Sequence, residues 1–351
     1  MALRSFLCTC LLASQLLLAA QAVHPMLRHY SAKDGLPSSE VYDIMQDQQG
    51  YIWVSTDNGI ARFNGYQFET FGPDDGLSDP VVFHLFEDHR GWIWMYSFKD
   101  KIFIYRDGGI HLFPHSDLIK SFRATDNPSG VDWIHVDRQG DLYASVSGYG
   151  IVKITEDGGC TDITADVPAG IVLWTHEEYH FTGFKSYAYF SPTAEDHEYY
   201  QLPRDQFGVI TIMKAGGPDS VLVKPRKRYP ESTANLFHKN NARQPALPRI
   251  PLQFNDRLEV LDISTGQTVQ YIPYTTGTII NWLSSKKGPL TFLGHDYADR
   301  GLSIFDRSDY LDHLDVLREP RLRMLQGTTI THLLEDHQGG LWIGTLKDGI
   351  Y

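Results

Sequence analysis

Cysteine is scarce in this 351-residue chain, which has three, and two of them, Cys8 and Cys10, lie within residues 1–22. Those residues are typical of a secretory signal peptide, with Arg4 ahead of an apolar core and a small-x-small cleavage pattern at 20–22. After cleavage only Cys160 remains, which excludes an intramolecular disulfide, and we expect this thiol to be buried and inert. Neither leader cysteine lies at the cleavage site, so lipid attachment is not indicated.

Positive charge is also scarce, because 31 Lys and Arg residues face 43 Asp and Glu residues, for a formal net charge of -12. This balance argues against direct contact with nucleic acid. Beyond the leader, the chain has no apolar run of the roughly 20 residues that a membrane-spanning helix needs. A hydrophobic fraction of 42% is nevertheless ample for a large core, so we expect residues 23–351 to be folded.

The patterns that mark catalytic and metal sites are missing. No HxH or HExxH sequence and no spaced group of Cys and His occurs, which gives metal catalysis little support. Ser38 and Ser39 lie in a turn without the G-x-S-x-G context of a hydrolase nucleophile. The sequence therefore assigns no catalytic residue, no metal site and no cofactor, although it leaves enzymatic activity open.

Turns separated by short alternating runs are abundant, and residues 41–63, VYDIMQDQQGYIWVSTDNGIARF, are the clearest example. VYDIM alternates apolar and polar residues, as a half-buried strand does. Asp47 to Gly50 is a tight turn, YIWVST runs back, Asp57 to Gly59 turns again, and IARF is a third strand. A fourth follows at 66–71. Four antiparallel strands in about forty residues predict one blade of an all-β propeller.

The turn pattern D-x-x-G-x-[IL]-[WY] occurs four times. Its copies are 47–53, 88–94, 137–143 and 336–342, the first two being 41 residues apart. Each Asp lies at the same turn of a different blade, so we interpret these residues as turn formers rather than metal ligands. Trp53, Trp94 and Trp342 recur at one strand position, which favours packing between blades over a sugar-binding platform.

Between the third and last copies the motif fades while the strand spacing persists. We expect a fourth blade from 171–175, 179–184, 187–190 and 199–202; a fifth from 209–214, 220–223, 257–263 and 268–273; and a sixth from 279–283, 290–293 and 302–305. The last blade has three strands ending at Tyr351, and 27–30 is a lone strand that can complete it. We therefore predict a seven-bladed β-propeller of four-stranded antiparallel blades, closed by its N-terminal strand.

The fifth blade is about thirty residues longer than the others, and the excess at 229–255 is rich in proline, which predicts an insertion between two strands. It follows the basic run 224–228, the only one in this acidic chain. Two readings stay open: a solvated surface excursion, or a flap over the mouth of the propeller.

Two segments, DGLPSSEVYDIMQDQQGYIWVSTDNGIARFNGYQF and TTITHLLEDHQGGLWIGTLKDGIY, closely resemble the two-component regulator propeller repeat. The resemblance is close over 34–105 and 328–351, partial over 133–154 and weak in between. It implies the periplasmic, ligand-sensing propeller of a membrane-bound histidine kinase or hybrid sensor that controls transcription by phosphorelay. No membrane helix, phosphoacceptor His or nucleotide-binding Gly motif occurs before Tyr351. We therefore expect the N-terminal part of a longer, membrane-tethered sensor, or else a stand-alone propeller.

A ligand site is expected where the blade-joining loops surround one end of the central channel. The residues singled out for ligand contact are Asp34, Ser38, Asn58, Asp79, Lys99, Arg226 and Arg228. The expected partner is an extracellular small molecule or oligosaccharide, together with a second propeller or a second copy of the chain. A propeller lyase or hydrolase of the streptogramin-lyase type and a protein-binding scaffold are the alternatives.

Overall fold

The computed structural model is all-β. It describes residues 26–122, 131–137, 139–146, 150–162, 171–174, 199–202, 210–213, 220–223, 235–236, 249–253, 257–262, 267–273, 278–285, 287–296, 300–306 and 319–351. The expected signal peptide at 1–22 and the candidate residues Arg226 and Arg228 lie outside these ranges.

The N-terminal part forms three four-stranded antiparallel sheets whose strands follow chain order. They are β1 (Val41–Gln46), β2 (Ile52–Thr56), β3 (Gly59–Phe63) and β4 (Phe68–Phe71); β5 (Val82–Glu87), β6 (Ile93–Ser97), β7 (Ile102–Arg106) and β8 (Gly109–Leu112); and β9 (Val131–Val136), β10 (Leu142–Val146), β11 (Gly150–Ile154) and β12 (Cys160–Asp162). Short 3-10 helices, η1 (Ala32–Asp34), η2 (Pro73–Asp75) and η3 (Ser116–Phe122), precede the first strands of these sheets. The strands predicted around the first three turn motifs are confirmed.

The remaining strands form three two-stranded sheets and two four-stranded sheets. β13 (Ile171–Trp174) pairs with β14 (Tyr199–Leu202), and β15 (Ile210–Met213) pairs with β16 (Ser220–Val223). Two further four-stranded sheets are β17 (Asn235–Leu236), β18 (Arg249–Gln253), β19 (Arg257–Asp262) and β20 (Gln267–Pro273), then β21 (Thr278–Ser284), β22 (Thr291–Asp296), β23 (Gly301–Phe305) and β24 (Leu322–Met324). β25 (Ile330–Glu335) pairs with β26 (Leu341–Thr345).

The strand pairing expected for the fourth and fifth blades is wrong. β13 pairs directly with β14, whereas the sequence placed two further strands between them. β19 and β20 share their sheet with β17 and β18, not with β15 and β16. The stretch expected to be an insertion, 229–255, contributes β17 to this sheet, and also β18, which pairs with β19. Pro251 hid this strand, because proline argues against a paired strand, yet it lies opposite Val260.

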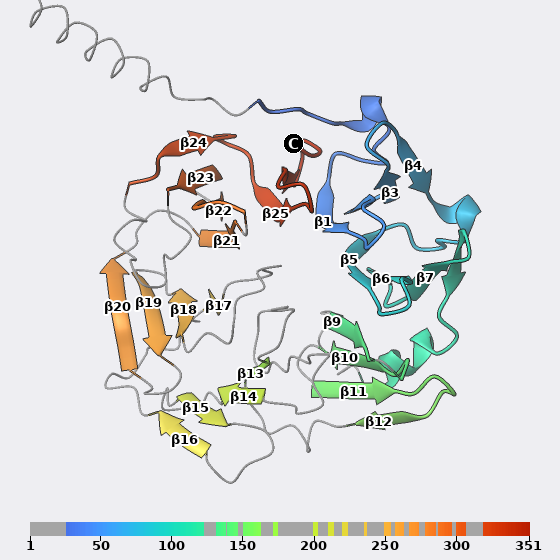
Figure 1. Ribbon diagram of the computed structural model, residues 1–351. Helices are drawn as coiled ribbons and strands as arrows, with labels where there is room; N and C mark the ends of the chain where they lie inside the picture. Colours follow the sequence, from blue (N-terminus) through green and yellow to red (C-terminus); the bar gives the residue numbers. More distant parts are fainter. Residues whose placement is uncertain are drawn as a thin grey trace, which may run out of the picture.

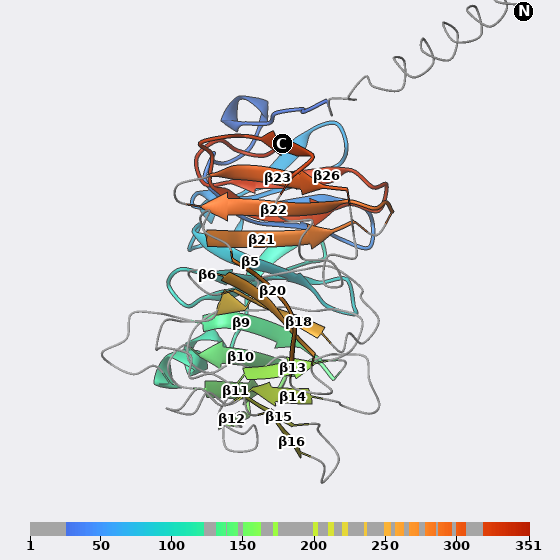
Figure 2. The ribbon, with the colours of Figure 1, turned by 90° about the vertical axis from the view of Figure 1, so that its left-hand side faces the viewer.

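The sheets are arranged around a ring (Figure 1). In the four-stranded sheets the first strand, such as β1, β9 or β21, lies towards the centre, and the later strands lie progressively outwards. Turning the molecule by 90° shows β21, β22 and β23 one above another (Figure 2).

Buried apolar side chains gather in clusters that each draw on neighbouring sheets. One cluster combines Trp53 and Ile60 of the first sheet with Leu85, Met95 and Phe103 of the second. Others join the second sheet to the third, the β21–β24 sheet to β25 and β26, and this last pair to the first sheet. These five sheets therefore bury apolar side chains against their neighbours, as blades of a propeller do.

The termini pair with each other beside β26. The N–H of Tyr30 donates to the Ile350 carbonyl at 2.8 Å, and the N–H of Ile350 donates back to the Tyr30 carbonyl at 3.0 Å. Tyr351 in turn exchanges two backbone hydrogen bonds with Ile343 of β26, at 2.9 and 3.0 Å. Residues around 30 and 350 thus extend the β25–β26 sheet outwards by two short segments.

The aspartate that opens each repeated turn also binds the aromatic residue six positions later. Nε1 of Trp53 donates to Oδ2 of Asp47 at 2.7 Å, and Nε1 of Trp94 donates to Oδ2 of Asp88 at 3.0 Å. The other oxygen of Asp47 accepts from the N–H of Tyr51 at 2.8 Å. One carboxylate therefore fixes both the turn and the strand that follows it.

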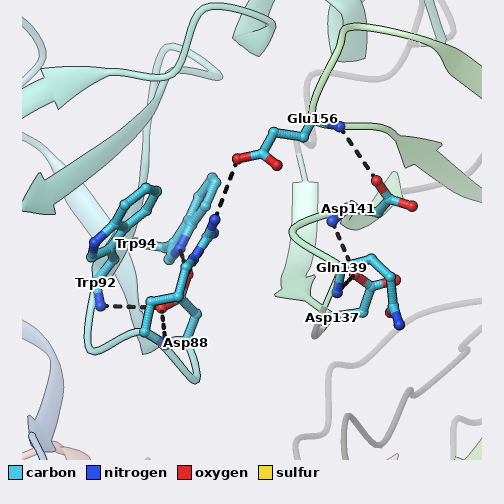
Figure 3. A network of polar contacts seen from close by, with 8 residues as sticks. Asp88, Trp92, Trp94, Asp137, Gln139, Asp141 and Glu156 are labelled. Atoms are coloured by element: carbon cyan, nitrogen blue, oxygen red, sulfur yellow. Dashed lines mark hydrogen bonds and ion pairs between the residues drawn. The ribbon is translucent and has the colours of Figure 1, made fainter.

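The third repeat keeps the contact with a different aromatic residue. The Tyr143 hydroxyl donates to Oδ2 of Asp137 at 3.1 Å, while the N–H groups of Gln139 and Asp141 donate to Oδ1, each at 2.9 Å. Figure 3 shows this turn beside that of Asp88 in the neighbouring sheet. The interpretation of these aspartates as turn formers is confirmed, and the motif's final W or Y is the hydrogen-bond donor.

In three of the four repeats, the residue before the turn aspartate contacts the preceding sheet. Oε1 of Gln46 accepts from the N–H of His337 at 2.6 Å, and Oε2 of Glu87 accepts from the N–H of Gln48 at 2.9 Å. Glu335 accepts from a serine hydroxyl of the β21–β24 sheet at 2.6 Å. The repeat therefore encodes contacts between sheets as well as the turn itself.

Candidate functional site

The loops entering β1 and β5 lie at the same end of the sheets as the β2–β3 and β6–β7 turns, because strands alternate in direction. We call these segments, 31–40, 57–58, 72–81 and 98–101, the mouth. They interlock through backbone hydrogen bonds: the N–H of Gly59 donates to the Pro80 carbonyl at 2.7 Å, and that of Phe98 to the Val81 carbonyl at 2.8 Å. The mouth is thus a hydrogen-bonded surface and not a set of independent loops.

Asp34, the first predicted ligand residue, caps η1. Its Oδ2 accepts from the N–H of Ser31 at 2.8 Å and from the Ser31 hydroxyl at 3.1 Å. These two hydrogen bonds lower the pKa of the Asp34 carboxyl, since both favour the charged form. Asp75 does the same for η2 by accepting from the N–H of Gly72 at 2.8 Å. The recurring Asp-Gly of the entry loops is therefore explained by capping.

Ser38 and Asn58 hold the first entry loop and the turn beside it. The Ser38 hydroxyl accepts from the N–H of Glu40 at 3.1 Å, and Nδ2 of Asn58 donates to the Pro37 carbonyl at 3.2 Å. Asn58 is exposed and Ser38 is partly exposed. Their contact with a ligand stays a prediction, and each already has a local role that accounts for its position.

Asp79 and Lys99 are brought together in the second sheet. Oδ2 of Asp79 accepts from the N–H of Lys99 at 2.7 Å, and the Asp79 side chain is buried, with 2% of the residue exposed. Lys99 is exposed. The buried Asp79 carboxylate therefore holds the backbone of the β6–β7 turn, and the exposed Lys99 side chain is the part of this pair that a ligand could reach.

Three aromatic rings on or beside the mouth were not singled out by the sequence. Tyr42 and Phe83 meet edge to face with ring centroids 5.0 Å apart, and Phe83 meets Phe98 at 5.9 Å. Phe83 is 38% exposed and Phe98 63% exposed. We call Tyr42, Phe83 and Phe98 the aromatic ridge, which crosses from the first sheet to the second.

The ridge has a polar end. The Tyr42 hydroxyl donates to Oε1 of Glu40 at 2.6 Å, and burial, together with this carboxylate, raises the pKa of the Tyr42 phenol. The phenol therefore remains a neutral hydrogen-bond donor. The sequence signal for the ridge is a difference between repeats: Tyr42 and Phe83 occupy a position where the last repeat has Thr331.

A hollow of about 350 Å³ lies at the opposite end of the first sheet, lined by residues of β3, β4 and the turn between them. Arg62 on its wall packs over the rings of Trp53 and Tyr105, donates to the Tyr105 hydroxyl at 2.9 Å and forms an ion pair with Glu69. Its charge is already neutralised, so the hollow offers no evident receptor for an anion.

Other chemistry is sparse in the part of the chain that the structure describes. Within it, no group of three His, Cys, Asp or Glu side chains is arranged to hold a metal ion. No described helix is long and apolar enough to cross a membrane. Cys160 is a free, partly buried thiol, and burial raises its pKa, which disfavours the reactive thiolate.

Comparison with known sequences identifies the repeat. Residues 35–58 and 324–347 match the family described as two component regulator propeller. The matched segments contain the mouth loop of the first sheet and the turn motif of the last. The chain thus carries two-component regulator propeller repeats, as its resemblance predicted. No curated protein matches the sequence.

Solved structures show the same fold at low identity. The extracellular domain of the hybrid two component system BT3049 from B. thetaiotaomicron aligns with a TM-score of 0.58 and 17% identity, covering 93% of this chain. This chain spans only 41% of that domain's length. A catalytically inactive virginiamycin B lyase from Staphylococcus aureus with quinupristin aligns with a TM-score of 0.52 and 15% identity, covering 92% of this chain and 96% of that one. YCF48 bound to D1 peptide aligns with a TM-score of 0.52 and 10% identity, covering 94% and 98%.

Proposed function

We propose that this chain is the ligand-sensing propeller of a two-component system, exported to the periplasmic face of the cell envelope. The observation that carries the proposal is the match to two-component regulator propeller repeats near both ends of the chain. Fold likeness to an extracellular sensor domain is consistent with it. Ligand binding, kinase input and periplasmic location are parts of this proposal.

The proposal includes a closed ring of seven blades. It groups β13 to β16 into one blade, since β14 and β15 are in contact, and gives each of the other sheets one blade. Pairing of Tyr30 with Ile350 supports closure, because it adds the N-terminal segment to the last sheet. A closed ring leaves no open sheet edge between the termini.

The aromatic ridge is the proposed contact surface for the ligand. Rings of Tyr42, Phe83 and Phe98 offer apolar area at the mouth, and Glu40 and Lys99 add a hydrogen-bond acceptor and a cation beside them. Such a surface suits a small molecule or an oligosaccharide, whose sugar rings stack on aromatic side chains and whose hydroxyls need polar partners. Binding signals only if it favours one arrangement of the attached domains over another.

Replacing Phe98 with alanine is expected to weaken ligand binding about tenfold, since burying an exposed aromatic ring contributes roughly 1.5 kcal/mol or more. Stability should change little because Phe98 is 63% exposed. Isothermal titration with a ligand found by screening measures the effect. Tyr66→Ala is the matched control: Tyr66 is 91% exposed but lies on the β3–β4 turn, at the other end of the first sheet. Equal affinity of the Phe98 variant and wild type would remove the ridge from the proposal.

The connection to a kinase has its own test. We expect the coding sequence to continue beyond Tyr351 into further repeats, a membrane helix and a histidine kinase, and sequencing of the gene reads this directly. A stop codon at this point without a neighbouring kinase gene would contradict the kinase connection while leaving ligand binding to be measured. The lyase and scaffold alternatives stay predictions. A lyase would convert the bound compound to product, and a scaffold would bind a protein instead of a small molecule.

A further inference from the structure

A buried carboxylate lies between two imidazoles at the inner side of the ring. Oδ2 of Asp43 lies 2.8 Å from Nδ1 of His84, and Oδ1 lies 3.0 Å from Nδ1 of His332. The exposed fractions of Asp43, His84 and His332 are 2%, 8% and 4%. The three residues come from β1, β5 and β25, so the group, which we call the His-Asp-His link, joins the first, second and last sheets.

The repeat itself brings these side chains together. Each residue precedes the turn aspartate of its own repeat by four positions, and each follows a shift in strand register, at 41/43, 82/84 and 330/332. Such bulges re-aim a side chain relative to a regular strand. The third repeat has Trp133 at this position, so the combination of acid and bases belongs to the junction around the first sheet.

The carboxylate is also bound by backbone. The N–H of Ile44 donates to Oδ1 at 2.9 Å, and that of Leu85 donates to Oδ2 at 3.0 Å. With both imidazoles neutral, the link holds one buried negative charge. One additional proton on either imidazole makes it neutral, and a buried charge is costly unless an opposite charge compensates it.

The strands packed against the link carry few other titratable groups. β2, β26 and β21 carry no titratable side chain. On β1, the Tyr42 hydroxyl donates to Glu40. Glu87 of β5 and Glu335 of β25 make the intersheet bonds described above, towards the other end of each strand, and Asp47, which follows β1, makes its turn bonds there. β22 carries His295, whose Nε2 lies 2.9 Å from the Ser303 hydroxyl, and Asp296; β9 carries Asp132 and His135, whose side chains lie outside the described part of the structure.

We propose that Asp43, His84 and His332 form a proton-responsive link between the first, second and last sheets, which binds one proton in the folded protein at pH values where histidines of the unfolded chain are neutral. The link is conformational and not catalytic: less than 1 Å² of His84 Nε2 is accessible, so it does not meet a substrate. The proposal stands on this geometry and does not depend on a ligand.

The sign of the pH dependence follows from proton binding. Unperturbed histidine titrates near pH 6.5, so between about pH 8 and pH 6 the folded state binds more protons than the unfolded state, and stability rises as the pH falls. Without the carboxylate, a proton on either buried imidazole no longer compensates the charge of Asp43. Asp43→Asn should therefore cost more stability at pH 6 than at pH 8.

Chemical unfolding of wild type and Asp43→Asn at pH 6, 7 and 8 measures the ratio of their unfolding equilibrium constants. One proton changes such a constant by up to tenfold per pH unit, and we expect the ratio to be roughly tenfold larger at pH 6 than at pH 8. Asp79→Asn is the matched control: this carboxyl is equally buried and accepts a backbone N–H, so its ratio should stay constant. A constant ratio for Asp43→Asn as well would overturn the proposal.

A second set of variants keeps the test valid if Asp43→Asn fails to fold. His84→Gln and His332→Gln each leave the carboxylate with one imidazole, so each should keep a one-proton dependence between pH 6 and 8. The double variant should lose it. Retention of the full dependence in the double variant would show that other groups bind the proton, and would contradict the link.

Discussion

Replacing Gly349 with alanine is expected to lower the free energy of unfolding by about 3 kcal/mol, from overpacking and left-handed strain together. Gly349 has φ +67, and a Cβ there would lie 2.2 Å from the Tyr30 carbonyl oxygen. That oxygen accepts the hydrogen bond from Ile350, so relieving the clash must separate the two terminal segments. The N–H of Gly349 also donates to the carbonyl of Ser39, a residue of the mouth, at 2.9 Å.

Gly327→Ala is the matched control for this effect. Gly327 also has a left-handed backbone, with φ +84, but a Cβ added at this position would have no atom within 4 Å. It should therefore cost only the left-handed strain, about 1 kcal/mol. Denaturant unfolding compares the stability of the Gly349→Ala and Gly327→Ala variants. Hydrogen exchange of the Tyr30 and Ile350 amides reports directly on the pairing of the two terminal segments. Equal costs, with protected amides in both, would mean that the pairing of the termini contributes little to stability.

Asp88→Asn is expected to destabilise the protein by about 3 kcal/mol, because an amide cannot replace this carboxylate. Asp88 is 1% exposed. Its Oδ1 accepts hydrogen bonds from the N–H groups of Arg90 and Trp92, and its Oδ2 accepts one from Nε1 of Trp94. In asparagine, the atom facing the indole would be an NH₂ group. Two donors would then face each other in a buried site, and the ion pair with Arg90 would be lost.

Asp137→Asn provides the comparison, since its aromatic partner is a phenol. The hydroxyl of Tyr143 donates to Asp137 in the native turn, but a hydroxyl also accepts, so it can rotate to receive the asparagine NH₂. We expect a cost of about 1 kcal/mol or less, measured by denaturant unfolding of both variants. Equal destabilisation at the two sites would mean that charge, and not donor geometry, determines the cost.

The strands near both ends of the chain could be predicted because their sequence signals are local. An Asp-x-x-Gly turn fixes where one strand, such as β1, ends and the next, β2, begins, and the same residues appear in each copy, which indicates their role in the turn. Pairing in the middle depends on which distant segment lies alongside, and Pro251 concealed a strand that is recognisable only from its partner, β19. Alternating Ile250 and Leu252 was the available signal.

The proximity of the mouth loops could be predicted from topology, whereas the aromatic ridge beside them could not. Asp34 and Asp79 are used by the loop backbones, which a sequence cannot distinguish from ligand contact. Tyr42 and Phe83 were not singled out, because their exposure depends on the register shifts at 41/43 and 82/84. A one-residue change of register moves side chains to the other face, and nothing in the local composition marks it.

Calorimetric titration of residues 23–351 with a panel of oligosaccharides and small metabolites, with the products analysed afterwards, tests the sensor proposal most directly. The account predicts that at least one compound binds, that it is recovered unchanged, and that Phe98→Ala weakens its binding while Tyr66→Ala does not. Turnover of the bound compound would contradict a sensor and favour the lyase alternative. Absence of binding across the panel, with protein partners retained, would favour a scaffold.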